Sequence, residues 1–166
     1  MAAEVPTADI GRTGASTAWR SVDGDAGSVA RYLDRVTAEL ADAKAKVTAL
    51  LGLAPGQAAL EVGCGLGRDT EAMARQVAPG GHAVGLDLSE ELVGQAIGRT
   101  ASLGLPLRFE VGSVMALPFE DASFDAVRIE RTLQHLQGPG EAMMEVARVL
   151  RPGGRLAVLE PDPPCQ

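Results

Sequence analysis

The sequence has only two cysteines among 166 residues, no excess of basic residues and no long apolar run. Cys64 and Cys165 stand in very different contexts, so they do not suggest a disulfide framework. A net charge of −7 offers no basic surface for phosphate groups, which argues against nucleic-acid binding. The uncharged stretch 47–60 is too short to span a bilayer, and no signal peptide is visible. The sequence therefore predicts a cytoplasmic protein without a membrane span.

What is present is the composition of one globular domain, with 46% hydrophobic and 22% charged residues. Residues 1–25 are small, polar and rich in glycine, and we expect them to form a mobile arm before a single domain at 26–166. From Ser28 to Leu51 the apolar residues recur at alternating intervals of four and three, which predicts a helix. Its apolar face predicts packing on a core, and the same spacing also permits a helix–helix dimer seam.

After this helix, short apolar runs alternate with helical periods. We expect strands at 58–62, 83–86, 107–111, 124–129 and 156–159. We expect helices at 69–78, from the capping residue Ser89 to Gly104, and from Pro139 to a break at 151–154. Such alternation is typical of βαβ units with right-handed crossovers. The sequence therefore predicts an α/β fold, a Rossmann-like doubly wound parallel sheet of about five strands preceded by an N-terminal helix.

Three glycines at alternate positions, Gly63, Gly65 and Gly67, link the first of these strands to the helix after it. Glycine lets the backbone turn tightly and approach a ligand without interference from a Cβ atom. Asp87 ends the next strand, 20 residues after Gly67. In a doubly wound sheet its carboxylate lies beside the glycine loop, where it can accept hydrogen bonds from two ribose hydroxyls. This pair of features predicts a site for an adenosine-containing ligand.

The spacing of the glycines separates two classes of such ligand. The dinucleotide fingerprint Gly-x-Gly-x-x-Gly requires glycine where this sequence has Arg68, because Gly67 comes one residue early. The pattern acid-x-Gly-x-Gly-x-Gly is matched in full by Glu61, Gly63, Gly65 and Gly67. It resembles motif I of the class I S-adenosylmethionine-dependent methyltransferases.

The resemblance extends from Gln57 to about Asp162. In order, it covers residues 85–89, 112–119, 124–127 and 150–156, which look like the ribose-binding strand end, the adenine loop, the fourth strand and the turn into the fifth strand. The nearest group is that of small-molecule enzymes such as the quinone-biosynthesis methyltransferases. The resemblance implies S-adenosylmethionine as cofactor, a small-molecule methyl acceptor and no metal.

It also implies roles for individual residues. Cofactor-binding roles are implied for Tyr32, Glu61, Gly63, Cys64, Gly65, Gly67, Asp87, Leu88, Ser113, Val114, Glu130 and Arg131. Glu61 and the loop would line the methionine half, Asp87 would hold the ribose, and Ser113 and Val114 would meet the adenine. The family usually has an acid where this sequence has Ser113, and a hydroxyl accepts more weakly than a carboxylate.

A general base is needed only if the methyl acceptor has a proton to lose. His135 is the first candidate, because it follows the fourth strand and can titrate near neutral pH, and Glu130 is the second. His135 also suits a purely structural role in a short turn. Arg128 lies inside the fourth strand, where we expect it to snorkel or to pair with an acid.

Three functions remain open from the sequence. The first is methyl transfer to a small molecule by in-line displacement. The second is cofactor binding by a catalytically incomplete domain, since the family core has seven strands and only five are counted here. The third is a nicotinamide-dependent oxidoreductase.

With only five strands, the fifth strand, 156–159, would lie at an open edge of the sheet. An exposed apolar edge predicts either a homodimer or a marginally stable monomer.

Overall fold

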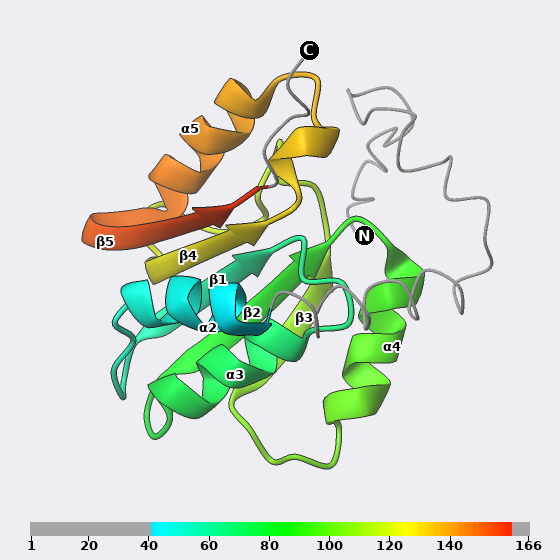
Figure 1. The fold of residues 1–166 in the computed structure, drawn as a ribbon, viewed down its shortest axis with the longest axis vertical. Coiled ribbons are helices and arrows are strands. Elements are labelled where there is room, and N and C mark those ends of the chain that lie inside the picture. Colours follow the sequence, from blue (N-terminus) through cyan, green and yellow to red (C-terminus); the bar gives the residue numbers. More distant parts are fainter. Residues whose placement is uncertain (1–40, 161–166) are drawn as a thin grey trace, which may run out of the picture.

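Five parallel strands form a single sheet in the computed structural model, which describes residues 41–160 (Figure 1). They are β1 (Ala58–Val62), β2 (His82–Asp87), β3 (Leu107–Val111), β4 (Phe124–Glu130) and β5 (Leu150–Leu159). Their order across the sheet is β3-β2-β1-β4-β5, and every neighbouring pair is parallel. The predicted doubly wound α/β sheet of five strands is thereby confirmed.

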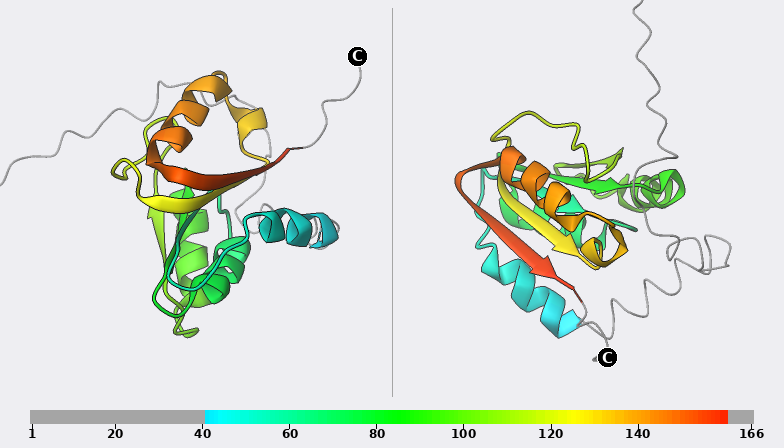
Figure 2. Two further views of the ribbon diagram at one scale, coloured as in Figure 1. Left: turned by 90° about the vertical axis from the view of Figure 1, so that its left-hand side faces the viewer. Right: turned by 90° about the horizontal axis from the view of Figure 1, so that it is seen from above.

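Within residues 41–160, four α-helices and one short 3-10 helix connect or precede the strands. They are α2 (Ala41–Leu50), α3 (Arg68–Val77), α4 (Glu90–Thr100), η2 (Leu133–His135) and α5 (Pro139–Val149). Helix α5 covers one face of β4 and β5, and α2 lies on the opposite face (Figure 2). Within residues 41–160, every helix is too short or too polar to traverse a lipid bilayer.

The chain changes direction across the sheet between β1 and β4. From β1 it winds outward to β2 and β3, and it then returns to place β4 on the other side of β1. At such a switch point the loops that follow the two strands diverge, which leaves a crevice at the carboxyl ends of the strands. The glycine loop after β1 and the segment after β4 therefore meet at the same edge of the sheet.

Successive side chains of a strand point to opposite faces of the sheet, so the core has two layers, one on each face. The layer on the α5 face contains large side chains, among them Leu60, Phe124 and Ile129, with Val114 and Leu117 from the loop between β3 and β4. The layer on the α3 face contains small side chains from the strands, namely Ala59, Ala83, Ala126 and Ala157. Small side chains on a sheet let a helix approach closely, so α3 lies near the strands whose ends form the site.

Helix α2 corrects one sequence prediction. The expected apolar face included Leu50, whose exposed fraction is 77%, whereas the buried positions of α2 are Lys44 and Thr48. Val47 is half-buried against the α3-side layer. The predicted face is therefore correct at Val47 and wrong at Leu50, and the burial of Lys44 is stabilised by ion pairs, which apolar periodicity does not register. The earlier part of this predicted helix, the arm at 1–25 and Cys165 lie outside the described residues.

Strand β5 corrects a second prediction, that residues 151–154 form a break before a strand at 156–159. The strand begins at Leu150, directly after α5, and its pairing with β4 shifts register between Phe124 and Ala126. Gly153 has a φ of +79°, a backbone conformation that glycine adopts without strain. The segment that looked like a break is therefore an irregular excursion inside the strand.

Phe124 provides a test of the α5-side layer. Its ring is 2% exposed and packs edge-on against Phe119, with ring centroids 5.0 Å apart. Phe124→Ala should lower the free energy of unfolding by about 3 kcal/mol or more, because the cavity adds to the lost burial. Chemical denaturation measures it. Met144→Ala on α5, where Met144 is 67% exposed, is the control and should change stability by less than about 0.5 kcal/mol.

Candidate functional site

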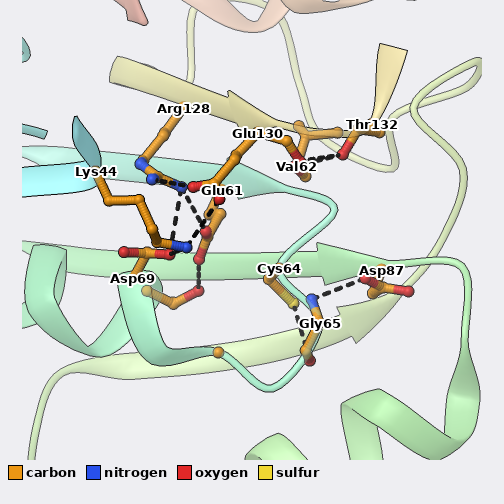
Figure 3. A network of polar contacts seen from close by, with 12 residues as sticks. Lys44, Glu61, Val62, Cys64, Gly65, Asp69, Asp87, Arg128, Glu130 and Thr132 are labelled. Carbon is orange, nitrogen blue, oxygen red and sulfur yellow. Dashed lines mark hydrogen bonds and ion pairs between the residues drawn. The ribbon is translucent and has the colours of Figure 1, made fainter. Parts of the chain in front are cut away.

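The glycine loop is anchored to the end of β2 through its own backbone. The N–H groups of Gly63 and Cys64 both donate to the carbonyl of Leu86, at 2.8 and 3.0 Å. The N–H of Gly65 donates to Oδ2 of Asp87 at 2.8 Å (Figure 3). These three donors are consumed within the protein, so this part of the loop has none of them left to bind the pyrophosphate of a dinucleotide.

Asp87 is held at the carboxyl end of β2 with part of its carboxylate still available. Oδ2 accepts from Gly65, and Oδ1 accepts from the N–H of Ser89 at 2.9 Å. Burial raises the pKa of Asp87, and the N–H groups of Ser89, Gly65 and Leu88 oppose this by stabilising the carboxylate. A carboxylate has about four lone-pair sites, so acceptor capacity remains for hydroxyl groups of a ligand.

Two glycines of the loop are required by close contacts. A Cβ on Gly63 would overlap the hydroxyl of Thr132, which follows β4. The backbone after β1 is therefore in direct contact with a side chain that follows β4. A Cβ on Gly67 would overlap the ring of Phe109 on β3 and would lie 3.2 Å from Ala96 of α4. Gly67 also has a φ of +68° and caps α3.

Arg128 is fully buried in β4 and is surrounded by carboxylates at the base of the loop. Its guanidinium donates to Oε1 of Glu61 at 3.0 Å, pairs with Glu130 on its own strand, and lies 3.5 Å from Oδ2 of Asp69. Its Nε has no hydrogen-bond partner among the described residues. The expectation that Arg128 is paired is correct, and the pairing brings the ends of β1, β4 and α3 together.

Lys44 adds a second cation from α2. Its Nζ lies 2.7 Å from Asp69 and 2.9 Å from Glu130, and its side chain is only 10% exposed (Figure 3). We call Lys44, Glu61, Asp69, Arg128 and Glu130 the charge cluster. The cluster contains three carboxylates and two cations.

Glu61 is the most perturbed carboxyl of the charge cluster. Burial, reinforced by the negative charge of Asp69, raises its pKa from an ordinary 4.5 to about 8, against the opposing effects of Arg128, Thr70 and Lys44. The hydroxyl of Thr70 donates to Oε2 of Glu61 at 2.5 Å. A proton on Glu61 makes the cluster electrically neutral, which favours its uptake in a buried setting.

Cys64 behaves as a small buried spacer. Its side chain is 7% exposed, and burial raises the pKa of its thiol far above the ordinary value, with the carboxylates of Glu61 and Asp87 adding to the effect. The thiol therefore stays protonated, and a thiol in this state is a poor nucleophile.

The segment after β4 is held by a carboxylate from β5's end. Glu160 accepts from the backbone N–H groups of Thr132 and Leu133, both at 2.9 Å. Arg131 has a positive φ of 50°, and its N–H donates to the carbonyl of Leu159. His135 follows in η2 and is half-buried. This clamp fixes the backbone that leads from Glu130 to His135.

The residues expected to contact the adenine differ in how far their side chains are exposed. Leu88 is 47% exposed beside Asp87, so its side chain is open to a ligand. The hydroxyl of Ser113 accepts from the N–H of Met115 at 3.2 Å within its own turn. Val114 is 5% exposed and packs in the α5-side layer, so only its backbone is left to line a pocket. Tyr32 lies outside the described residues.

Four charged residues of the site were missed by sequence reasoning. Lys44 and Asp69 complete the charge cluster, Glu160 clamps the segment after β4, and Arg99 of α4 donates to the carbonyls of Leu66 and Gly67 at 3.0 and 2.8 Å. Asp69, directly after the loop in the first turn of α3, was the only one with a local signal. The others depend on contacts across the fold.

Comparison with known proteins identifies the family. A methyltransferase domain model matches residues 60–158, which include the glycine loop, Asp87 and the segment after β4. The chain belongs to this family of S-adenosylmethionine-dependent methyltransferase domains. The comparisons give no support to the oxidoreductase alternative.

Several curated relatives are similar over most of this chain. An uncharacterized 37.1 kDa protein in transposon TN4556 of Streptomyces fradiae is 44% identical, over 79% of this chain and 38% of that protein. Demethylmenaquinone methyltransferases are 36% identical in Bacillus cytotoxicus and 39% in Staphylococcus aureus, over 69% of this chain and 49% and 47% of theirs. The chain thus spans half or less of the length of these relatives.

Solved structures share the fold. An S-adenosylmethionine-dependent methyltransferase from Aquifex aeolicus is 25% identical with a TM-score of 0.73, covering 87% of this chain and 78% of that one. The 4+2 cyclase SpnF is 31% identical with a TM-score of 0.66, covering 72% and 44%.

The residues present fit the family's cofactor. S-Adenosylmethionine has no pyrophosphate, and the three loop donors that would hold one are already bonded to Leu86 and Asp87. It carries a sulfonium and an ammonium group, and the loop lies beside the acid-rich charge cluster. Asp87 would hold the ribose, and Glu61 with the loop would face the methionine half.

The raised pKa of Glu61 predicts how stability depends on pH. Between about 4.5 and about 8 the folded protein holds a proton that the unfolded chain has lost, so the free energy of unfolding should fall as pH rises through this window. Glu61→Gln keeps the shape of the protonated side chain and should reduce that slope. Urea denaturation at several pH values measures it. Equal slopes in both proteins would contradict the assignment.

Proposed function

We propose that this chain binds S-adenosylmethionine and transfers its methyl group to a small-molecule acceptor. The observation that carries the proposal is the contact between the Gly65 N–H and the carboxylate of Asp87 at 2.8 Å. It joins the glycine loop to the acid at the end of the neighbouring strand, which leaves an edge rich in acceptors and suited to a cationic, ribose-containing ligand.

In this proposal the chain supplies position and electrostatics. The bound cofactor supplies an activated methyl group on a sulfonium. Asp87 orients the ribose, and the loop from Gly63 to Gly67 lets the backbone approach the methionine half. The clamp from Glu160 holds the segment after β4 where it borders the acceptor. Positioning of this kind accounts for much of the acceleration of a displacement between two bound molecules.

Of the two base candidates, His135 is favoured. Both carboxylate oxygens of Glu130 are already engaged, one by Lys44 and the other by Arg128. Taking up a proton from an acceptor would therefore require Glu130 to give up one of these ion pairs. His135 lies on the short helix that directly follows the clamped segment, at the same edge of the sheet. The proposal therefore assigns proton removal to His135 when the acceptor carries a proton.

Cofactor binding without methyl transfer is the second candidate function. Its support is that SpnF, which shares the fold at 31% identity, is described as a 4+2 cyclase, so this fold also serves other chemistry. A tritium-release or mass-spectrometric assay with phenols, quinols and amines separates the two candidates. Binding without any turnover across that panel would favour the second one.

The proposal extends to the acceptor and the location. Demethylmenaquinone methyltransferases are among the relatives, which supports a small acceptor that includes a quinol ring. The net charge of −7 supports an acceptor other than nucleic acid. The free thiol of Cys64 suits a cytoplasmic location, where cysteines stay reduced.

Asp87→Ala should weaken the binding of S-adenosylmethionine by about tenfold or more. Charged hydrogen bonds to the ribose contribute roughly 1.5–3 kcal/mol, which corresponds to this factor. Isothermal titration calorimetry measures it. Asp121→Ala is the control, because Asp121 is an exposed acid that pairs with Arg148 away from the loop. Unchanged affinity in Asp87→Ala would place the ligand elsewhere.

We also propose that the chain forms a homodimer through β5. Within residues 41–160, β5 pairs only with β4, so its outer row of backbone N–H and C=O groups has no strand beside it. Leu156 and Val158 on this strand are 37% and 41% exposed. A second copy related by a two-fold axis could pair β5 with β5, which satisfies both edges at once.

Val158→Lys tests this dimer. A lysine on an edge strand opposes pairing with another strand, so the variant should be monomeric at concentrations where the wild-type chain is dimeric. Light scattering at several concentrations measures the mass of both. Met144→Lys places the same charge at an exposed position of α5 and should leave the dimer intact. A wild-type chain that stays monomeric throughout would rule the dimer out.

A further inference from the structure

The charge cluster has an imbalance that its internal contacts do not remove. Glu61, Asp69 and Glu130 provide three carboxylates, whereas Lys44 and Arg128 provide two cations. Lys44 bridges Asp69 and Glu130, and Arg128 contacts all three acids. When every member is ionised, one negative charge is left over in a part of the protein where side chains are at most 18% exposed.

This surplus charge lies at the place where the methionine half of the cofactor is expected. Glu61 is the second residue before Gly63, and its charge already acts on the thiol of Cys64 within the loop. Buried charges act over longer distances than exposed ones, because little water lies between them and their neighbours. A ligand on the loop therefore experiences the charge state of the cluster without needing to touch it.

The reaction changes the charge of the cofactor. During transfer a lone pair of the acceptor forms a bond to the methyl carbon while the carbon–sulfur bond breaks, and its electron pair stays on sulfur. The sulfonium becomes a neutral thioether, and any proton of the acceptor leaves to a base. S-Adenosylmethionine, with a sulfonium, an ammonium and a carboxylate, has a net charge of +1, and its product S-adenosylhomocysteine has none.

We infer that the charge cluster makes the site prefer the sulfonium form of the cofactor over the neutral product, since only the former compensates the surplus negative charge of the cluster. The inference rests on the proposed function and assigns Glu61 a role in specificity. In the free protein a proton compensates the same charge. Cofactor binding then displaces this proton, and methyl transfer lets the proton return, which favours release of the product.

Glu61 is the member that holds the proton. It is 3% exposed, its Oε1 accepts from Arg128, and its Oε2 accepts from Thr70. The charged groups that act on it are Lys44 of α2, Asp69 of α3 and Arg128 of β4. Glu130 shares Arg128 with it, and Glu61 and Asp87 both act on the thiol of Cys64 in the loop. Burial and Asp69 outweigh the two cations in setting its pKa to about 8.

The test is the pH dependence of two affinities. Calorimetry should measure the dissociation constants of S-adenosylmethionine and S-adenosylhomocysteine from about pH 6.5 to about pH 8.5. At pH values below the pKa of Glu61, about 8, the dissociation constant of S-adenosylhomocysteine divided by that of S-adenosylmethionine should rise by about three- to tenfold per pH unit. Titrations in buffers with different ionisation heats should show proton release of about one for S-adenosylmethionine and less for its product.

Glu61→Gln should bind both ligands with a ratio that no longer changes with pH, because the amide mimics the protonated acid. Glu120→Gln changes an exposed acid before β4 and should keep the wild-type profile. A wild-type ratio that is constant over the whole pH range overturns the inference and leaves the proposed function in place. A chain that binds neither ligand overturns both.

Discussion

The burial of Arg128 in a central strand is the constraint on which the site depends. A fully buried guanidinium is stable only when acids surround it, and they come here from β1, β4 and α3. These contacts fix the separation of the two strand ends between which the switch-point crevice opens. The same acids then require a second cation, so Lys44 draws α2 against the cluster. The arrangement of the strand ends at the loop and the position of α2 thus have one common cause.

The glycine loop and the charge cluster divide the work of recognition. The loop contributes shape. Its first three N–H groups donate to the end of β2, and its glycines are closely packed against Thr132 and Phe109. The cluster contributes charge without occupying the crevice. In the proposed function, shape and charge would thus come from different parts of the chain.

Local patterns in the sequence were sufficient for the strands, the loop and its acid. The alternation of runs identified all five strands, and Ser89 caps α4 as expected, accepting from Leu92 at 3.3 Å. Lys44 could not be predicted, because its burial depends on Glu130, 86 residues away. Strand β5 was expected too late, since the glycines of 153–154 resemble a break although they lie inside the strand. Local signals identify elements, whereas charge compensation across the sheet has no local signature.

The long sequence separations within the cluster have a consequence for how the chain folds. Arg128 and Glu61 are 67 residues apart, and Lys44 and Glu130 are 86 apart. Contacts of this range close large loops, and the entropy lost in closing them opposes their formation. Until β4 is inserted beside β1, the acids remain in water and no recognition edge exists. Ligand recognition is thus a property of the completely assembled sheet, and a bound cofactor would slow the opening of the interior rather than the fraying of its ends.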